Sequence, residues 1–87
     1  MPVYMADRDL PGITLEQLAD AQRRAIETSR RFSHESKPVR YIRSTFVPGE
    51  AHVMCLFEAA HPALVEEVNR AGGIPFVRVV EALDLTP

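Results

Sequence analysis

The amino-acid sequence predicts an α+β domain with elements in the order β-α-β-β-α-β. Three observations predict this class: two stretches with apolar side chains at helical spacing, runs rich in β-branched and aromatic residues around them, and proline or glycine at the junctions. The order is that of the ferredoxin-like arrangement, a four-stranded antiparallel sheet with two helices on one face. At 87 residues, we expect residues 1–87 to form a single ferredoxin-like domain.

The first strand and the first helix are separated by a short break. Residues 3–7 are expected to form a strand, and Pro11-Gly12 interrupts the chain after it. Thr14 followed by Gln17 is the pattern of a capping box, in which each side chain satisfies a backbone N–H at the helix start. Small and apolar side chains then recur at a spacing of about 3.6 residues. This pattern predicts a helix that ends between His34 and Lys37.

The middle of the chain predicts a hairpin. Residues 39–47 and 51–58 are both rich in β-branched, aromatic and apolar side chains, and Pro48-Gly49 lies between them. A turn dipeptide between two such runs is typical of two antiparallel strands.

The last part of the chain predicts the second helix and the last strand. Pro62 suits the first position of a helix, since that position needs no N–H donor. Gly72-Gly73 provides residues for the C-terminal cap. We expect residues 76–83 to form the final strand, followed by a short tail.

Composition excludes several classes of protein. Hydrophobic residues make up 46% of the chain and charged residues 25%, as in ordinary globular domains. The net charge of −2 is unlike that of nucleic-acid-binding proteins, and no apolar run reaches the ~18–20 residues that span a bilayer. The single cysteine excludes an internal disulfide and a four-cysteine zinc site. We therefore expect a cytoplasmic protein with no nucleic-acid or membrane partner.

The two faces of the predicted sheet are both apolar. With Val47 set opposite Ala51, Arg43 lies opposite Cys55. The side expected to face the helices then carries Ile42, Phe46, Met54 and Leu56. The other side carries Tyr41, Arg43, Val53, Cys55 and Phe57. Two helices cover only one face, so we expect a face-to-face homodimer that encloses a cavity. The alternative is a monomer with an exposed apolar face.

Arg43, Cys55 and Tyr41 are the predicted ligand-binding residues. A guanidinium beside a cysteine favours the thiolate form, and together with the Tyr41 hydroxyl it would hold an anionic ligand between the sheets. The alternative is a buried structural cysteine, with Arg43 paired to a carboxylate such as Asp7 or Glu81.

The sequence predicts no catalytic residues. It contains no GxSxG, P-loop or GxGxxG motif. The three histidines, His34, His52 and His61, do not cluster, which argues against a metal site within one chain but leaves open a site assembled across a dimer. Arg8 and Asp9 are expected either to fasten the following loop by a salt bridge or to touch a ligand.

Several short motifs together resemble a known family. They are Arg8-Asp9-Leu10-Pro11-Gly12, Tyr41-Ile42-Arg43-Ser44, residues 54–59, Asn69-Arg70-Ala71-Gly72 and residues 79–82. In order and spacing they resemble the small bacterial nickel-binding-protein-like domain of unknown function, over nearly the whole chain. The resemblance implies a ferredoxin-like dimer and, in at least one branch, binding of a divalent metal such as nickel.

Relatives of this kind often carry histidine where this chain has Arg43, beside the strand cysteine that matches Cys55. A guanidinium cannot ligate a divalent cation, and its positive charge repels one. The resemblance therefore provides no metal ligands for this sequence.

Three hypotheses of function follow. The preferred hypothesis is a small dimeric binding protein that holds a small ligand or a metal ion at the sheet–sheet interface. The alternative is an enzyme of the cofactor-free monooxygenase or isomerase type, with its pocket between sheet and helices. A ligand-free accessory protein is a third hypothesis.

Overall fold

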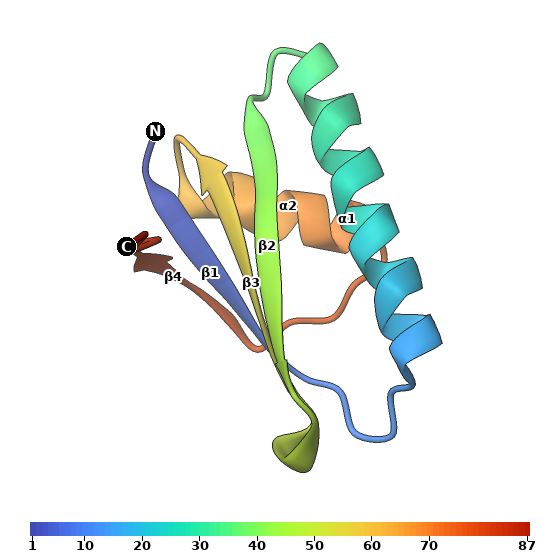
Figure 1. Cartoon of the computed structure of the whole chain (residues 1–87). Coiled ribbons are helices and arrows are strands. Elements are labelled where there is room, and N and C mark those ends of the chain that lie inside the picture. Colours follow the sequence, from blue (N-terminus) through green and yellow to red (C-terminus); the bar gives the residue numbers. More distant parts are fainter.

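The structure has two layers, a four-stranded antiparallel sheet and two helices that cover one of its faces (Figure 1). It is a computed structural model that describes residues 1–87. The elements are β1 (Val3–Asp9), α1 (Leu15–His34), β2 (Val39–Val47), a 3-10 turn (Pro48–Glu50), β3 (His52–Ala59), α2 (Pro62–Ala71) and β4 (Arg78–Ala82). The strand order β2-β3-β1-β4 confirms the predicted α+β, ferredoxin-like fold. Neither helix is long and apolar enough to cross a membrane.

The helix termini follow the sequence signals. The Thr14 hydroxyl accepts a hydrogen bond from the Gln17 N–H at 3.1 Å, and the Gln17 side chain accepts one from the Thr14 N–H at 3.0 Å. This is the predicted capping box of α1. Pro62 begins α2. Gly73, with φ +67°, supplies the left-handed residue after that helix.

The core lies between the helices and the covered face of the sheet. Its sheet side consists of Tyr4 and Ala6 of β1, Val39 of β2, and Val53, Cys55, Phe57 and Ala59 of β3. Its helix side includes Ala21, Ala25 and Phe32 of α1, and Val65 and Val68 of α2.

The predicted pairing of β2 with β3 is wrong by one residue. Val47 pairs with His52, not with Ala51. Ala51 has φ +50° and follows the 3-10 turn, so the turn uses one residue more than the sequence pattern indicates. Ser44 is consequently opposite Cys55, and Arg43 is opposite Leu56. A register shift between Tyr41 and Arg43 restores the pairing of Tyr41 with Phe57.

This slip reverses the predicted faces of β3. Side chains alternate along a strand, so a shift of one residue moves each of them to the other face. Phe46 lies on the covered face as predicted, but its partner there is Val53. Cys55 and Phe57 are buried under the helices. Met54 and Leu56 lie on the other face of the sheet, which no helix covers and which we call the open face.

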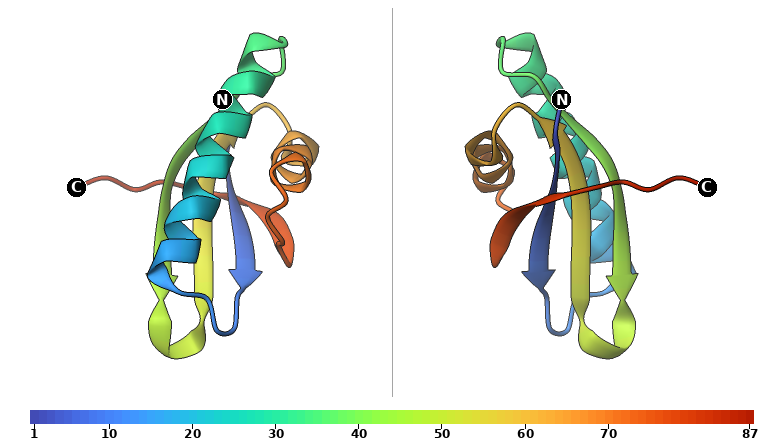
Figure 2. Two further views of the ribbon diagram at one scale, coloured as in Figure 1. Left: turned by 90° about the vertical axis from the view of Figure 1, so that its right-hand side faces the viewer. Right: turned by 90° about the vertical axis from the view of Figure 1, so that its left-hand side faces the viewer.

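Despite the reversed faces of β3, the open face of the sheet is apolar, as predicted for the face away from the helices. Val3, Met5, Met54, Leu56 and Val80 lie on it and are half-buried. The C-terminal tail crosses this face from β4 and extends beyond β2 (Figure 2). An ion pair between Arg43 Nη2 and Asp84 Oδ2, at 3.0 Å, ties the tail to β2. Leu83 and Leu85 of the tail are 81% and 84% exposed.

A polar cluster occupies one end of the open face. His52 Nε2 lies 2.6 Å from Asp7 Oδ1, and His52 Nδ1 lies 2.9 Å from Asp9 Oδ1. Arg78 Nε donates to the other oxygen of Asp7 at 3.0 Å. The hydrogen bond to Asp9 raises the pKa of His52 above its ordinary value of 6.5, against the opposing effect of partial burial. The negative charges of Asp7, Asp9 and Glu50 add to the increase.

We expect the substitution Asp9→Asn to lower the pKa of His52, measured by NMR titration of the histidine ring protons. A raised folded-state pKa means that His52 stabilises the fold fully below about pH 6.5, and that this contribution disappears as pH rises through the folded-state pKa. Between about pH 6 and 8, the urea midpoint of the wild type should therefore fall more steeply than that of Asp9→Asn. His34 and His61, which are exposed, serve as internal references whose titration curves should not change. Identical His52 curves in both proteins would contradict this assignment.

Candidate functional site

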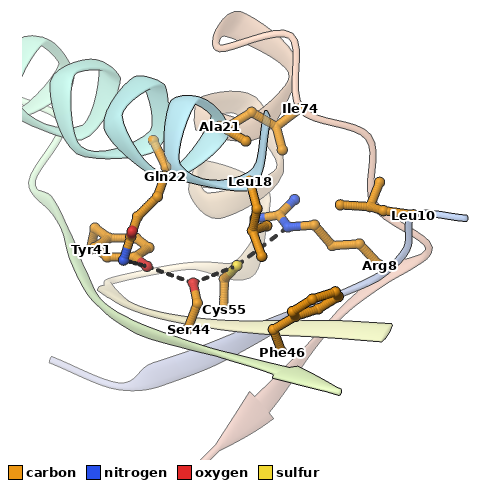
Figure 3. Close-up of a pocket in the computed structure, with 11 residues that line it drawn as sticks. Arg8, Leu10, Leu18, Ala21, Gln22, Tyr41, Ser44, Phe46, Cys55 and Ile74 are labelled. Atoms are coloured by element: carbon orange, nitrogen blue, oxygen red, sulfur yellow. Dashed lines mark hydrogen bonds between the residues drawn. The ribbon is translucent and has the colours of Figure 1, made fainter. Parts of the chain in front are cut away.

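A pocket of about 150 Å³ lies beneath α1, between that helix and the covered face of the sheet (Figure 3). Its apolar walls consist of Leu10, Leu18, Ala21, Ala25, Phe46 and Ile74. Its polar lining consists of Arg8, Gln22, Tyr41, Ser44 and Cys55. The alanines of α1 make room for the pocket, because a larger side chain at either position would fill it.

A chain of hydrogen bonds crosses the base of the pocket (Figure 3). Gln22 Nε2 donates to the Tyr41 hydroxyl at 2.9 Å, and that hydroxyl lies 2.5 Å from Ser44 Oγ. Ser44 Oγ donates to Cys55 Sγ at 2.9 Å. A serine hydroxyl has one proton, so the tyrosine must be the donor to Ser44. The chain therefore donates in one direction, toward the sulfur.

Arg8 approaches the same sulfur from β1. It is 2% exposed, and its Nε donates to Cys55 Sγ at 3.3 Å. Its Nη1 donates to the Pro75 carbonyl oxygen at 3.1 Å, while Nη2 has no hydrogen-bond partner. None of the ion pairs of the protein includes Arg8. A guanidinium stays charged, and a buried charge without a counterion costs several kcal/mol, so this group is incompletely satisfied by the protein.

The position of Arg8 follows from strand alternation. Tyr4, Ala6 and Arg8 alternate along β1 and all three are buried on the covered face. We predicted that this strand ends at Asp7 and that Arg8, in the following loop, either forms a salt bridge or touches a ligand. Arg8 is instead part of the strand and forms no salt bridge. The alternation of side chains along the strand could have placed Arg8, because it lies two residues after Ala6 and so on the same face.

The structure separates the three predicted ligand-binding residues. Tyr41 and Cys55 lie together in the pocket, joined through Ser44, but on the covered face of the sheet. Arg43 lies on the open face, where its side chain is 58% exposed and paired with Asp84. The predicted pairing of Arg43 with Cys55 is therefore wrong, because the longer turn shifts the register by one residue. Arg8 is the guanidinium that contacts the sulfur.

The donor set of the pocket does not suit nickel, the metal that the sequence resemblance implies. Cys55 is the only thiol, and the lining contains no imidazole and no carboxylate. The positive charge of Arg8 beside the sulfur would repel a divalent cation. Elsewhere in the chain, no three His, Cys, Asp or Glu side chains are placed to hold a metal ion. The residues of a single chain therefore do not form a nickel site.

Comparisons with known proteins agree with the fold. A search of the curated proteins gave no match. The crystal structure of SCO4226 from Streptomyces coelicolor A3(2) superposes with a TM-score of 0.79 and 20% sequence identity, covering 97% of this chain and 99% of that one. At this identity the likeness shows the fold.

A family model described as nickel responsive protein SCO4226-like matches residues 4–82. The match includes both helices and reaches from within β1 to the end of β4, so it covers every residue that lines the pocket. The chain belongs to the SCO4226-like family.

Proposed function

We propose that this protein is a small-molecule-binding protein whose ligand occupies the pocket beneath α1. The observation that carries this proposal is Arg8, a buried charge with one free nitrogen in a pocket whose walls are mostly apolar. Sites for small molecules combine an apolar lining with a few placed polar groups, and this pocket has both. The ligand site predicted from the sequence thus moves from the sheet–sheet interface to the covered face.

The volume of the pocket limits the ligand. An engineered apolar cavity of about 150 Å³ is known to bind benzene, and this pocket has a similar volume of about 150 Å³. A ligand of roughly six to eight non-hydrogen atoms therefore fits, whereas a nucleotide or a long lipid does not.

Binding is better supported than catalysis. The enzyme hypothesis also places a pocket between sheet and helices, but general acid–base catalysis needs a group that exchanges a proton near neutral pH. The lining has no histidine, aspartate or glutamate for this task. Cys55 is its only nucleophile of high intrinsic reactivity, and no general base lies beside it in the lining.

We also propose that two copies pair through their open faces. The support is the apolar surface formed by Met5, Leu56 and Val80, which two helices on the other side leave uncovered. A contiguous apolar area of this kind is uncommon on a monomer. The tail with exposed Leu83 and Leu85 extends past β2, where it would lie against a second copy (Figure 2).

The substitution Ala21→Leu tests the ligand site. Leucine would fill the pocket, so binding should be lost while the protein keeps an equal or higher melting temperature of its own. A ligand at 100 times its Kd stabilises by about 2.7 kcal/mol, or roughly 10–20 °C in a domain of this size. The measurement is a thermal-shift screen of small polar and apolar organic compounds against the wild type and the variant.

The control is Ala19→Leu, the same substitution at an exposed position of α1, which should keep the full response to each compound. The proposed function would be refuted if no compound shifted the wild type. It would also fail if Ala21→Leu bound the same compounds equally well.

The substitution Leu56→Glu tests the dimer. A glutamate in the middle of the paired faces would be a buried charge without a partner, so the variant should sediment as a monomer while the wild type sediments as a dimer at micromolar concentration. Leu15→Glu is the matched control, because Leu15 is 74% exposed in the first turn of α1, far from the open face. A wild type that sediments as a monomer overturns the dimer.

A further inference from the structure

We propose that the ligand of this pocket is a small carboxylate with a short apolar body, and that Arg8 binds its carboxylate group. The inference rests on the proposed function and goes further, because it names the charge and the shape of the ligand. It follows from three features of the site: an uncompensated charge, a guanidinium held in position, and apolar walls.

The charge of Arg8 is the first feature. It is the only charged residue in the lining. The carboxylates on either side of it along the chain, Asp7 and Asp9, both point to the opposite face of β1. Asp7 is paired with Arg78 and His52, and Asp9 with His52. Asp20, which belongs to α1 above the pocket, is paired with Arg23 and Arg24 of the same helix. An anion that enters the pocket therefore meets no carboxylate and one positive charge without a carboxylate partner.

The fixed orientation of Arg8 is the second feature. Nε is held by Cys55 Sγ, and Nη1 is held by the Pro75 carbonyl. These two bonds join β1 to β3 and to the segment before β4, so the guanidinium plane cannot swing out of the pocket without breaking both. Nη2 is left as the free donor. A donor that is already oriented binds an anion with a smaller entropy loss than a flexible side chain.

The apolar walls are the third feature. Leu18 lies above the sulfur and Phe46 lies beside it, with Leu10 next to Arg8 (Figure 3). An ion such as phosphate would lose its hydration on every side and gain a single cation. A monocarboxylate has one charged group to desolvate, which Arg8 can pair, and its hydrocarbon part gains from contact with the walls. The volume of about 150 Å³ admits a body of roughly four to six carbons.

The decisive experiment is a calorimetric titration of the wild-type protein with isovalerate and with isovaleramide, which have the same shape and differ in charge. We expect isovalerate to bind about tenfold more tightly or better, the ratio typical of a charge-assisted hydrogen bond. Inorganic phosphate, an anion without an apolar body, should bind at least about tenfold more weakly than isovalerate.

Two variants assign the preference to Arg8. Arg8→Gln keeps a donor but removes the charge, and should bind the acid and the amide with equal affinity. Arg8→Lys keeps the charge and should keep the preference for the acid. Because the comparison of acid and amide is made on the wild type, the inference stays testable even if Arg8→Gln does not fold.

The outcomes separate this inference from the proposed function. Equal affinity of the wild type for isovalerate and isovaleramide, with both lost in Ala21→Leu, would overturn the carboxylate inference and leave the pocket as a ligand site. The same conclusion follows if a neutral compound from the thermal-shift screen binds and isovalerate does not. If neither isovalerate nor any compound of the screen binds, the inference and the proposed function both fail.

Discussion

The burial of Arg8 beside Cys55 is the constraint on which the site depends. Arg8 lies on β1, a central strand of the sheet, and is 2% exposed. Its two hydrogen bonds reach β3 and the segment between α2 and β4, so a single side chain connects three parts of the chain around the pocket. A guanidinium in such a place cannot lose its charge, so the protein must retain either a polar partner or an opening toward solvent beside it. The pocket beneath α1 is that opening.

Small side chains on α1 keep the pocket open. Ala21 and Ala25 face the sheet and leave space beside it, which Leu18 of α1 and Phe46 of β2 border. The donor chain from Gln22 through Tyr41 and Ser44 to Cys55 ties α1 to β2 and β3. Hydrogen bonds thus link the polar side chains of the site, and Nη2 of Arg8 has no hydrogen-bond partner.

Membership of the SCO4226-like family describes the fold of this chain better than its ligand. The family model reaches from within β1 to the end of β4, yet the described chain contains no set of three side chains able to hold a metal ion. Arg8 and Cys55 together make a site whose charge is positive or neutral, which suits an anion more than a divalent cation. A shared fold is compatible with different ligands because the ligand depends on a few side chains in the pocket.

The sequence by itself determined the elements and their order. The Thr14–Gln17 capping box, Pro62 at the start of α2 and the Pro48-Gly49 turn are local signals, and each acts through residues close in the chain. Only the tertiary structure decided which residues share the pocket. That outcome depended on one extra turn residue, Ala51 at φ +50°, and on where β1 ended. Because strand faces alternate at every residue, a difference of one position moved Cys55 under α1 and away from Arg43, which stays on the open face, and no local pattern contains that information.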